Sequence, residues 1–286
     1  MTRETKKAEK LLVISRGASA VNAEVEARLV GEFADYRIVE FRPSRDLRQL
    51  LAPKARVVVA GGDGTVEHVV RQLADADHPL GVLALGTFNN FARALGLPAE
   101  LDKAIAVIKT GRARAITLGR VNGRVFLEAC TIGLFGEAIV LGDSAKDLKF
   151  GEILEKLKNV ISARRFEYEM SEDIQGKGAA MSLVFSNTSS IGSNLTVSSA
   201  SPVDPYLELS IEAGRTRTDV VGRAIASALS KREDEGLGGQ FRFRKLEVRT
   251  RPRVRIYADN RLVGRTPASI SAETSALKVI LPRGNP

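Results

Sequence analysis

The stretch that decides the fold of this chain is VVVAGGDGT, residues 57–65. A run of β-branched residues, typical of a buried strand, leads into three glycines grouped around Asp63, and a helical pattern begins at about Val66. Because glycine has no Cβ, the backbone can turn sharply there and can approach a ligand closely. The N-terminus of the following helix offers unpaired N–H groups and the positive end of the helix dipole. The segment therefore predicts a phosphate-binding turn at the carboxyl edge of a parallel sheet.

The polar residues of this turn allow two interpretations. Asp63 could hold a metal ion or orient a phosphate-bound water molecule. Alternatively, the turn is an ordinary strand–helix connection in which Asp63 or Thr65 caps the helix. Three glycines around an aspartate are more than a helix cap requires, so the sequence favours a ligand-binding turn.

A second strand, glycine turn and helix follow at residues 81–98, GVLALGTFNNFARALGLP. Gly86 and Thr87 open this turn. Asn89 and Asn90 add side-chain amides that can hydrogen-bond a nucleotide base, a sugar or a phosphate, although Asn89 could also serve only as a helix cap. The repetition of one architecture within so few residues favours a shared ligand site.

The first third of the chain alternates between strand-like and helix-like segments. We expect strands at 10–14, 36–41, 56–60 and 81–85, and helices at 22–33, 45–51 and 65–76. This rhythm predicts an α/β fold in which helices cover both faces of a parallel sheet.

After about residue 115 the pattern changes to short segments with period-two alternation, which predicts an antiparallel β-rich sandwich or barrel. The dipeptide Asn122-Gly123 favours a hairpin between the first two of these strands. Helical stretches at 144–163 and 218–229 interrupt the series. We therefore divide the chain into an α/β domain, residues 1–116, and a β-rich domain, residues 117–279. The tail at about 280–286 is expected to return to the first domain.

The two glycine turns resemble those of the diacylglycerol-kinase-like lipid kinases, a family that includes bacterial lipid kinases and sphingosine kinases. The resemblance is carried by VVVAGGDGTVEHVV at 57–70 and LGVLALGTFNNFARALGLP at 80–98, in matching order and spacing. GGDGT alone also occurs in NAD kinases and phosphofructokinases, whereas the second motif separates the lipid kinases from both. Weaker likeness extends through 118–140 and 185–195 to 256–282.

This resemblance implies an ATP-dependent lipid kinase that uses Mg²⁺, with the nucleotide in the first domain and the lipid substrate in the second. It assigns the nucleotide site to residues of the two turns: Gly61, Gly62, Gly64, Thr65, Gly86, Thr87, Asn89 and Asn90. Asp63 would position metal and phosphate as a catalytic residue. Asp204, within 203–205, corresponds to one of two acids that bind a structural magnesium in some members.

The half of the pattern that activates the acceptor departs from the family. Where the family has Asp-Gly-Glu near the C-terminus, with the Glu as the proposed base, this chain has Asp259-Asn260-Arg261. An arginine cannot accept the proton of an attacking hydroxyl, so Asp259 is the remaining catalytic candidate. The early Asn-Pro loop of the family is also replaced, here by Ser15-Arg16-Gly17.

The charge of the chain favours anionic partners. There are 43 Lys and Arg against 34 Asp and Glu, a net charge of +9, and nine basic residues against two acids fall between Gln240 and Arg265. Four arginines in that stretch alternate along an expected strand: Arg249, Arg251, Arg253 and Arg255. On one strand they would share a face. That face could bind an anionic membrane surface peripherally, or it could be a solvated face that protects a sheet edge.

Composition limits the class of protein and its location. With 44% hydrophobic and 27% charged residues, the 286-residue chain is typical of folded proteins. We find no apolar run long enough for a transmembrane helix or a signal-peptide core, so we expect a cytoplasmic protein that contacts the inner face of the membrane. The single cysteine, Cys130, excludes an internal disulfide, and His68 and His78 lack metal-ligand spacing. The apolar side of the expected helix at 148–166 fits a membrane surface or, more commonly, a core.

We therefore predict an ATP-dependent lipid kinase. One alternative is a catalytically weak or inactive relative that binds nucleotide or lipid, which Arg261 favours. The other is a nucleic-acid-binding protein that uses the arginines, against which stand the absence of Trp, only four Tyr and no nucleic-acid motif. Neither the lipid acceptor nor the oligomeric state follows from the sequence.

Overall fold

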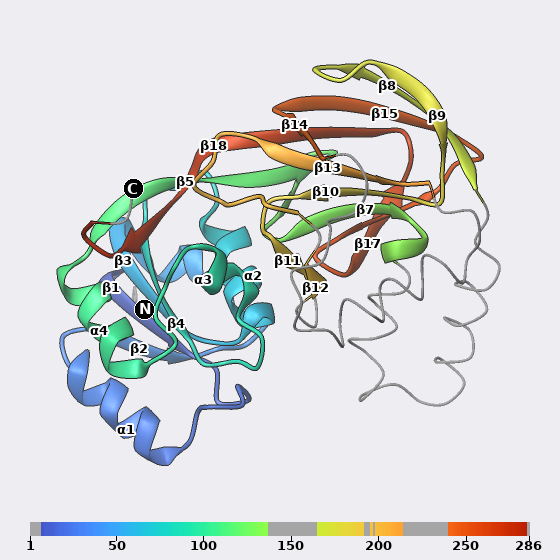
Figure 1. Ribbon diagram of the computed structural model, residues 1–286. Helices are drawn as coiled ribbons and strands as arrows, with labels where there is room; N and C mark the ends of the chain where they lie inside the picture. Colours follow the sequence, from blue (N-terminus) through green and yellow to red (C-terminus); the bar gives the residue numbers. More distant parts are fainter. Residues whose placement is uncertain (1–6, 137–164, 192–194, 197, 214–239, 285–286) are drawn as a thin grey trace, which may run out of the picture. The chain divides into compact units, whose positions relative to one another are not determined.

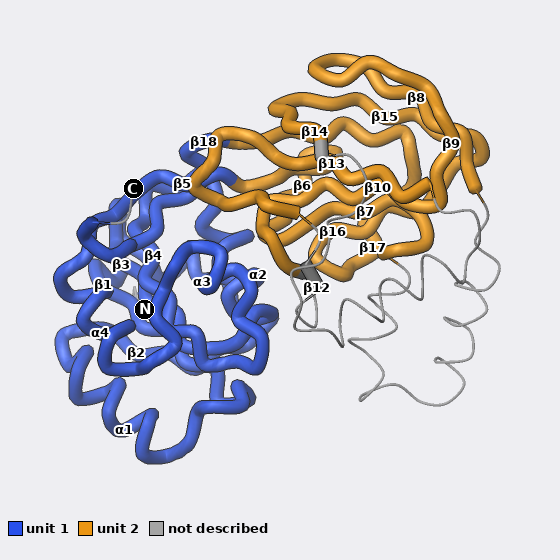
Figure 2. The backbone as a smooth tube through the Cα atoms, in the orientation of Figure 1, with its two compact units in different colours: residues 1–117, 274–286 blue, residues 118–273 orange. Residues whose placement is uncertain are grey.

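The computed structural model describes residues 7–136, 165–191, 195–196, 198–213 and 240–284 (Figure 1). The helices expected at 144–163 and 218–229 lie outside the described residues. The chain divides into two units, residues 1–117 with 274–286 and residues 118–273 (Figure 2). Within the described residues, no helix combines the length and the apolar character that crossing a bilayer requires.

The first unit is built on a parallel sheet with the strand order β2-β1-β3-β4. Its strands are β1 (Ala8–Ile14), β2 (Arg37–Glu40), β3 (Leu51–Gly61) and β4 (Pro79–Ala84). The apolar runs of β1, β3 and β4 are buried, as expected for inner strands whose two faces are both covered. The last part of β18 (Ala268–Leu281) pairs in parallel with β4. The expected parallel-sheet domain is confirmed.

Helices connect these strands. They are α1 (Ala23–Glu32), the short 3₁₀ helix η1 (Leu47–Leu50), α2 (Asp63–Leu73), α3 (Asn90–Ala94) and α4 (Leu101–Thr110). Asn22 caps α1, because its side chain accepts a hydrogen bond from the N–H of Val25 at 2.8 Å. Leu29 of α1 and Ile105 of α4 share one core with alternate residues of the sheet.

The second unit contains two antiparallel sheets. One has the order β14-β13-β10-β7-β16-β17, and its strands are β14 (Gln240–Phe243), β13 (Leu207–Glu212), β10 (Ser182–Ser186), β7 (Ala129–Gly133), β16 (Arg255–Ala258) and β17 (Arg261–Arg265). The other joins β8 (Phe166–Glu172), β9 (Gly176–Ala180) and β15 (Lys245–Arg251) to the first residues of β18. A two-stranded ladder is formed by β11 (Ser190–Ile191) and β12 (Leu195–Thr196). Phe185, Leu246 and Ile256 belong to one core shared by both sheets, so the unit is a sandwich.

The hairpin expected at Asn122-Gly123 joins β5 (Arg112–Val121) to β6 (Arg124–Phe126). Both turn residues have positive φ, 49° and 79°. These are the values that a two-residue type I′ hairpin requires, and Asn-Gly is the dipeptide that adopts them most readily.

The expectation that four arginines share one strand face is wrong. β15 ends at Arg251, and Pro252 follows it. Proline has no N–H for the hydrogen-bond ladder, so the strand cannot continue through it. Arg255 begins β16 in the other sheet. Only Arg249 and Arg251 therefore share a face of β15.

Candidate functional site

Both glycine turns lie at the carboxyl edge of the parallel sheet, on neighbouring strands. β3 ends at Gly61 and β4 ends at Ala84, and these two residues are partners in the register. The N–H of Leu85 donates to the carbonyl of Gly61 at 2.9 Å. The two turns therefore leave the sheet side by side, as the sequence predicted for a shared site.

Three of the glycines are required by the packing of the turns themselves. A Cβ on Gly86 would lie 2.4 Å from the Cα of Gly62, so the two turns are in backbone contact there. A Cβ on Gly61 would lie 2.8 Å from the Cβ of Thr65 and 3.1 Å from that of Ser15. Real Cβ atoms do not approach as closely as the 2.4 Å and 2.8 Å contacts, and a Cβ on Gly62 would lie a tight 3.1 Å from the Cα of Gly86. The packing of the protein alone thus accounts for these three positions.

Gly64 is different. A Cβ at this position would meet no atom within 4 Å, and its φ is not in the left-handed region. Gly64 lies in the first turn of α2, where alanine would be more favourable than glycine by about 1 kcal/mol. The fold thus supplies no reason for glycine, and its effect is to leave the space beside this helix N-terminus open.

Asp63 links the two turns. Its Oδ2 accepts a hydrogen bond from the N–H of Asn89 at 2.7 Å, and the backbone N–H groups of Asn90 and Phe91 also donate to this carboxylate. Asp63 therefore caps α3, whereas the N-cap residue of α2 is Gly62, which makes no side-chain cap. Burial raises the pKa of Asp63, and these N–H groups offset part of the rise.

The asparagines of the second turn serve its internal structure. Asn89 has a left-handed backbone, with φ of 54°. Its Oδ1 accepts from the N–H of Gly86 at 3.0 Å, and its Nδ2 donates to the carbonyl of Gly86 at 2.9 Å. Asn90 is buried at the start of α3. The side chains left at the surface of this turn are those of Thr87 and Phe88, and Phe88 is 39% exposed.

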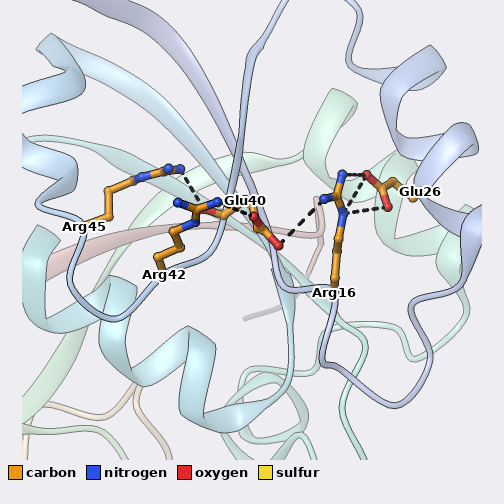
Figure 3. Close-up of polar contacts among 5 residues, drawn as sticks. All are labelled: Arg16, Glu26, Glu40, Arg42 and Arg45. Atoms are coloured by element: carbon orange, nitrogen blue, oxygen red, sulfur yellow. Dashed lines mark hydrogen bonds and ion pairs between the residues drawn. The ribbon is translucent and has the colours of Figure 1, made fainter.

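Charged residues that the sequence did not assign to a site follow the ends of β1 and β2 at the same edge, with Glu26 of α1 beside them (Figure 3). The guanidinium of Arg16 pairs with the carboxylate of Glu26 at 2.6 Å and lies 3.7 Å from that of Glu40. Arg42 pairs with Glu40 at 3.1 Å, and Arg45 donates to the carbonyl of Glu40 at 2.7 Å. In the sequence, the signals for this cluster were the ends of the expected strands and the replaced loop at Ser15-Arg16-Gly17.

The remaining predicted site residues lie in the second unit. Asp259 forms the tip of the β16–β17 hairpin with Asn260, and both have left-handed φ, 43° and 63°. The carboxylate of Asp259 accepts hydrogen bonds from the N–H groups of Leu127 and Glu128, each at 2.9 Å. Arg261, at the position of the family's glutamate, follows as the first residue of β17.

Asp204 lies in a turn, where its N–H donates to the carbonyl of Ser201 at 2.9 Å. In the part of the chain that the structure describes, no three His, Cys, Asp or Glu side chains come together as metal ligands. A magnesium at Asp204 stays a prediction. His68 packs edge-on against Phe41, with the ring centroids 5.3 Å apart, and Cys130 is buried in the core.

Known proteins resemble both the sequence and the fold. Residues 15–121 match the diacylglycerol kinase catalytic domain. A Pseudomonas aeruginosa protein named "Probable lipid kinase YegS-like" is 30% identical over 97% of this chain and 96% of its own length. A Bacillus subtilis protein named "Diacylglycerol kinase" is 37% identical over 48% of this chain and 47% of its own length.

Two solved structures share the fold. The crystal structure of a diacylglycerol kinase from Bacillus anthracis matches with a TM-score of 0.71 and 20% identity, over 98% of this chain and 99% of that one. An NAD kinase from Archaeoglobus fulgidus in complex with ATP matches with a TM-score of 0.54 and 14% identity, over 96% and 94%. The match in sequence over nearly the whole length of the Pseudomonas relative goes beyond a shared fold. The chain belongs to the family of lipid kinases that carry the diacylglycerol kinase catalytic domain.

Proposed function

We propose that this protein is an ATP-dependent lipid kinase that transfers the γ-phosphoryl group of ATP to a hydroxyl of a diacylglycerol-like lipid. The observation that carries the proposal is the open space at Gly64, beside the N-terminus of α2. Two turns packed through Gly62 and Gly86 leave that space free, and a helix N-terminus favours the negative charge of phosphate groups. The names of the relatives supply the class of acceptor.

In this proposal the first unit positions the nucleotide. The first turn of α2 would bind the phosphates through backbone N–H groups, and the exposed ring of Phe88 offers a surface on which a base could stack. The cluster around Arg16 would lie at the same carboxyl edge. Asp63 would act mainly by holding the two turns together, because its carboxylate already accepts backbone N–H groups.

Magnesium would enter with the nucleotide. The described residues contain no cluster of ligands that would form a dedicated magnesium site, and Mg²⁺ in kinases is commonly held by substrate phosphates with one or two carboxylates. The described residues therefore fit a metal carried by ATP better than one held by the protein. When bound, Mg²⁺ would neutralise charge on the phosphates.

On the acceptor side, the candidate residue is Asp259 at the tip of the β16–β17 hairpin. Asp259 is retained as the proposed base, although two backbone N–H groups hydrogen-bond its carboxylate and thereby stabilise its charged form. Phosphoryl transfer depends chiefly on positioning and charge neutralisation, so a modest base is compatible with turnover. The same geometry, together with Arg261, favours the second candidate, a catalytically weak relative that binds nucleotide.

The substitution Gly64→Ala tests the nucleotide site. It should leave the free energy of unfolding unchanged or raise it by up to about 1 kcal/mol, while a methyl group in the ligand's space weakens ATP binding on the order of tenfold or more. Gly31→Ala is the matched control, because Gly31 also lies in a helix with open space at its Cβ. Calorimetric ATP titration and urea unfolding give the two readouts.

A panel of diacylglycerol, a sphingoid base and a polyprenol, each assayed with labelled ATP, tests the activity. Phosphorylation of one lipid by the natural chain, lost in parallel with ATP affinity in Gly64→Ala, would support the kinase. ATP binding without phosphorylation of any acceptor would instead favour the weak relative. Unaltered ATP affinity in Gly64→Ala would show that the nucleotide does not bind at this turn.

A further inference from the structure

A groove of about 730 Å³ lies in the second unit, away from the residues discussed so far. Its walls are the β8–β9 hairpin, the end of β15 and the turn at Thr266-Pro267. The strands β9, β8 and β15 are neighbours in one sheet, as Figure 1 shows. Three of the four arginines that the sequence placed on one strand line this groove: Arg249 and Arg251 lie on β15, and Arg253 lies beyond its end.

The groove carries an excess of positive charge. Its basic side chains are Arg249, Arg251, Arg253 and Lys177, and its acidic ones are Glu167 and Glu169. Lys177 pairs with Glu169 at 2.9 Å. Lys177, and to a lesser extent Arg249 and Arg251, lower the pKa of Glu169, so this carboxylate is ionised and paired. Three guanidinium groups then face one remaining carboxylate, that of Glu167.

The arginines are available to a ligand. Arg249 and Arg251 are exposed, lie two residues apart on β15, and face Glu169 and Glu167 across the ladder. Neither arginine has a hydrogen bond or an ion pair with another described residue within 4 Å. Among the described residues, their guanidinium groups thus keep donors for an anion, although both also interact electrostatically with Glu169.

Arg253 is held in place by the backbone. Its Nε donates to the carbonyl of Thr266 at 2.6 Å. Thr266 is buried and is itself fixed, because its Oγ1 accepts from the N–H of Val254 at 3.0 Å and its N–H donates to the carbonyl of Val254 at 2.9 Å. One guanidinium of the groove is thus oriented before any ligand arrives, which lowers the entropy lost on binding.

We propose that this groove binds the phosphate group of an anionic phospholipid at a membrane surface. Guanidinium groups donate paired hydrogen bonds that match phosphate oxygens. Exposed charge pairs are individually weak, so a single soluble anion would be held poorly. A bilayer, in contrast, presents many headgroups together with a surface potential that attracts cations. The proposal deepens the proposed function, since a kinase for a lipid has to meet its substrate at an interface.

The test measures co-sedimentation with vesicles of phosphatidylcholine alone and of phosphatidylcholine with phosphatidylglycerol. The double substitution Arg249→Gln with Arg251→Gln should weaken binding to the anionic vesicles by about tenfold or more. The control is Arg124→Gln with Arg244→Gln, which removes the same charge from exposed arginines of the same unit outside the groove. Glu167→Gln, which removes the unpaired acid, should strengthen binding. Urea unfolding checks that each variant folds.

Equal losses in the two double variants would overturn the proposal, because net charge alone would then explain binding. Calorimetric binding of inorganic phosphate as tight as that of anionic vesicles would also overturn it, in favour of a soluble ligand. Phosphorylation of a detergent-solubilised lipid is measured in parallel. If the natural chain phosphorylates no lipid, the proposed function fails, while the vesicle comparison still decides the role of the groove.

Discussion

Asp63 in the first unit and Asp259 in the second are both acidic residues in the turn of a motif, but their surroundings differ. The carboxylate of Asp63 joins two glycine turns and lies next to the open space at Gly64. The carboxylate of Asp259 accepts N–H groups of Leu127 and Glu128, within the backbone of the sandwich. Both residues invite assignment as catalytic acids or bases, yet both stabilise backbone turns. An acidic residue in a motif can therefore be needed to hold a backbone turn, whether or not it takes part in the reaction.

The difference lies in what each carboxylate organises. Asp63 fixes the relative position of two turns that together border a space for a ligand. Asp259 ties the tip of the β16–β17 hairpin to Leu127 and Glu128, and Arg261 begins β17 at the position for which the resemblance implies a glutamate. Substitution of Asp63 should thus weaken ligand binding, whereas substitution of Asp259 should mainly lower the stability of the fold.

The largest effect is expected from Gly86→Ala, which tests whether the contact between the turns is as close as described. The new methyl group would lie 2.4 Å from the Cα of Gly62, and backbone atoms cannot move aside as a flexible side chain could. We expect the free energy of unfolding to fall by about 3 kcal/mol or more. Urea unfolding of this variant beside Gly64→Ala gives the comparison, and similar stabilities for the two would contradict the described packing.

Asp259→Ala comes next in size. It leaves two backbone N–H groups without their acceptor, one of them on the buried Leu127, so we expect a loss of about 2 to 3 kcal/mol in stability. Arg261→Glu separates this structural role from catalysis, because it restores an acid beside Asp259. A rise in lipid phosphorylation of about tenfold in Arg261→Glu would support a base at this hairpin. Unchanged turnover would show that the hairpin takes no part in the reaction.

Asp63→Ala should have a smaller effect on stability and a clear one on binding. Removal of a helix cap costs about 1 to 2 kcal/mol. Because the same carboxylate joins the turns, ATP affinity should fall as well, which titration calorimetry measures. Full ATP affinity in a variant that has lost the expected stability would show that the second turn is not part of the nucleotide site.

The smallest effect concerns pH. Burial raises the pKa of Asp63, so in the acid range the folded state binds more protons at this residue than the unfolded chain does. The contribution of Asp63 to stability is then greatest below the unfolded pKa and declines as the pH rises through the folded pKa. The variant Asp63→Asn should accordingly gain stability relative to the natural chain as the pH rises from the acid range toward neutral. Urea unfolding at a series of pH values measures the difference, and a constant difference would contradict the raised pKa.

Local patterns predicted much of this molecule. The β-branched run of β3, the glycine turns and Asn122-Gly123 each carry their structural reason within a few adjacent residues, and each is found as expected. The link from Asp63 to Asn89 could not be predicted in the same way, because 26 residues separate the two and their contact depends on how β3 and β4 pair.

The prediction that the four arginines share one strand face was wrong for a different reason. Period-two spacing predicted one face, but Pro252 in the middle of the series ended the strand, and that signal was present in the sequence. The groove that three of them line could not have been predicted, because it needs the β8–β9 hairpin from elsewhere in the chain. Period-two spacing indicates which side chains share a face only within one uninterrupted strand.

The fourteen-residue strand β18 has a consequence for how the protein is made. Its first residues pair with β15 in the second unit, and its last residues pair with β4 in the first. During translation, the whole of residues 118–273 is therefore synthesised before the segment that pairs with β4. Until then β4 presents an unpaired edge, the kind of surface at which nascent chains associate wrongly. A fragment ending near residue 117 would retain that exposed edge permanently, so the first unit has to be produced together with the segment that follows the second.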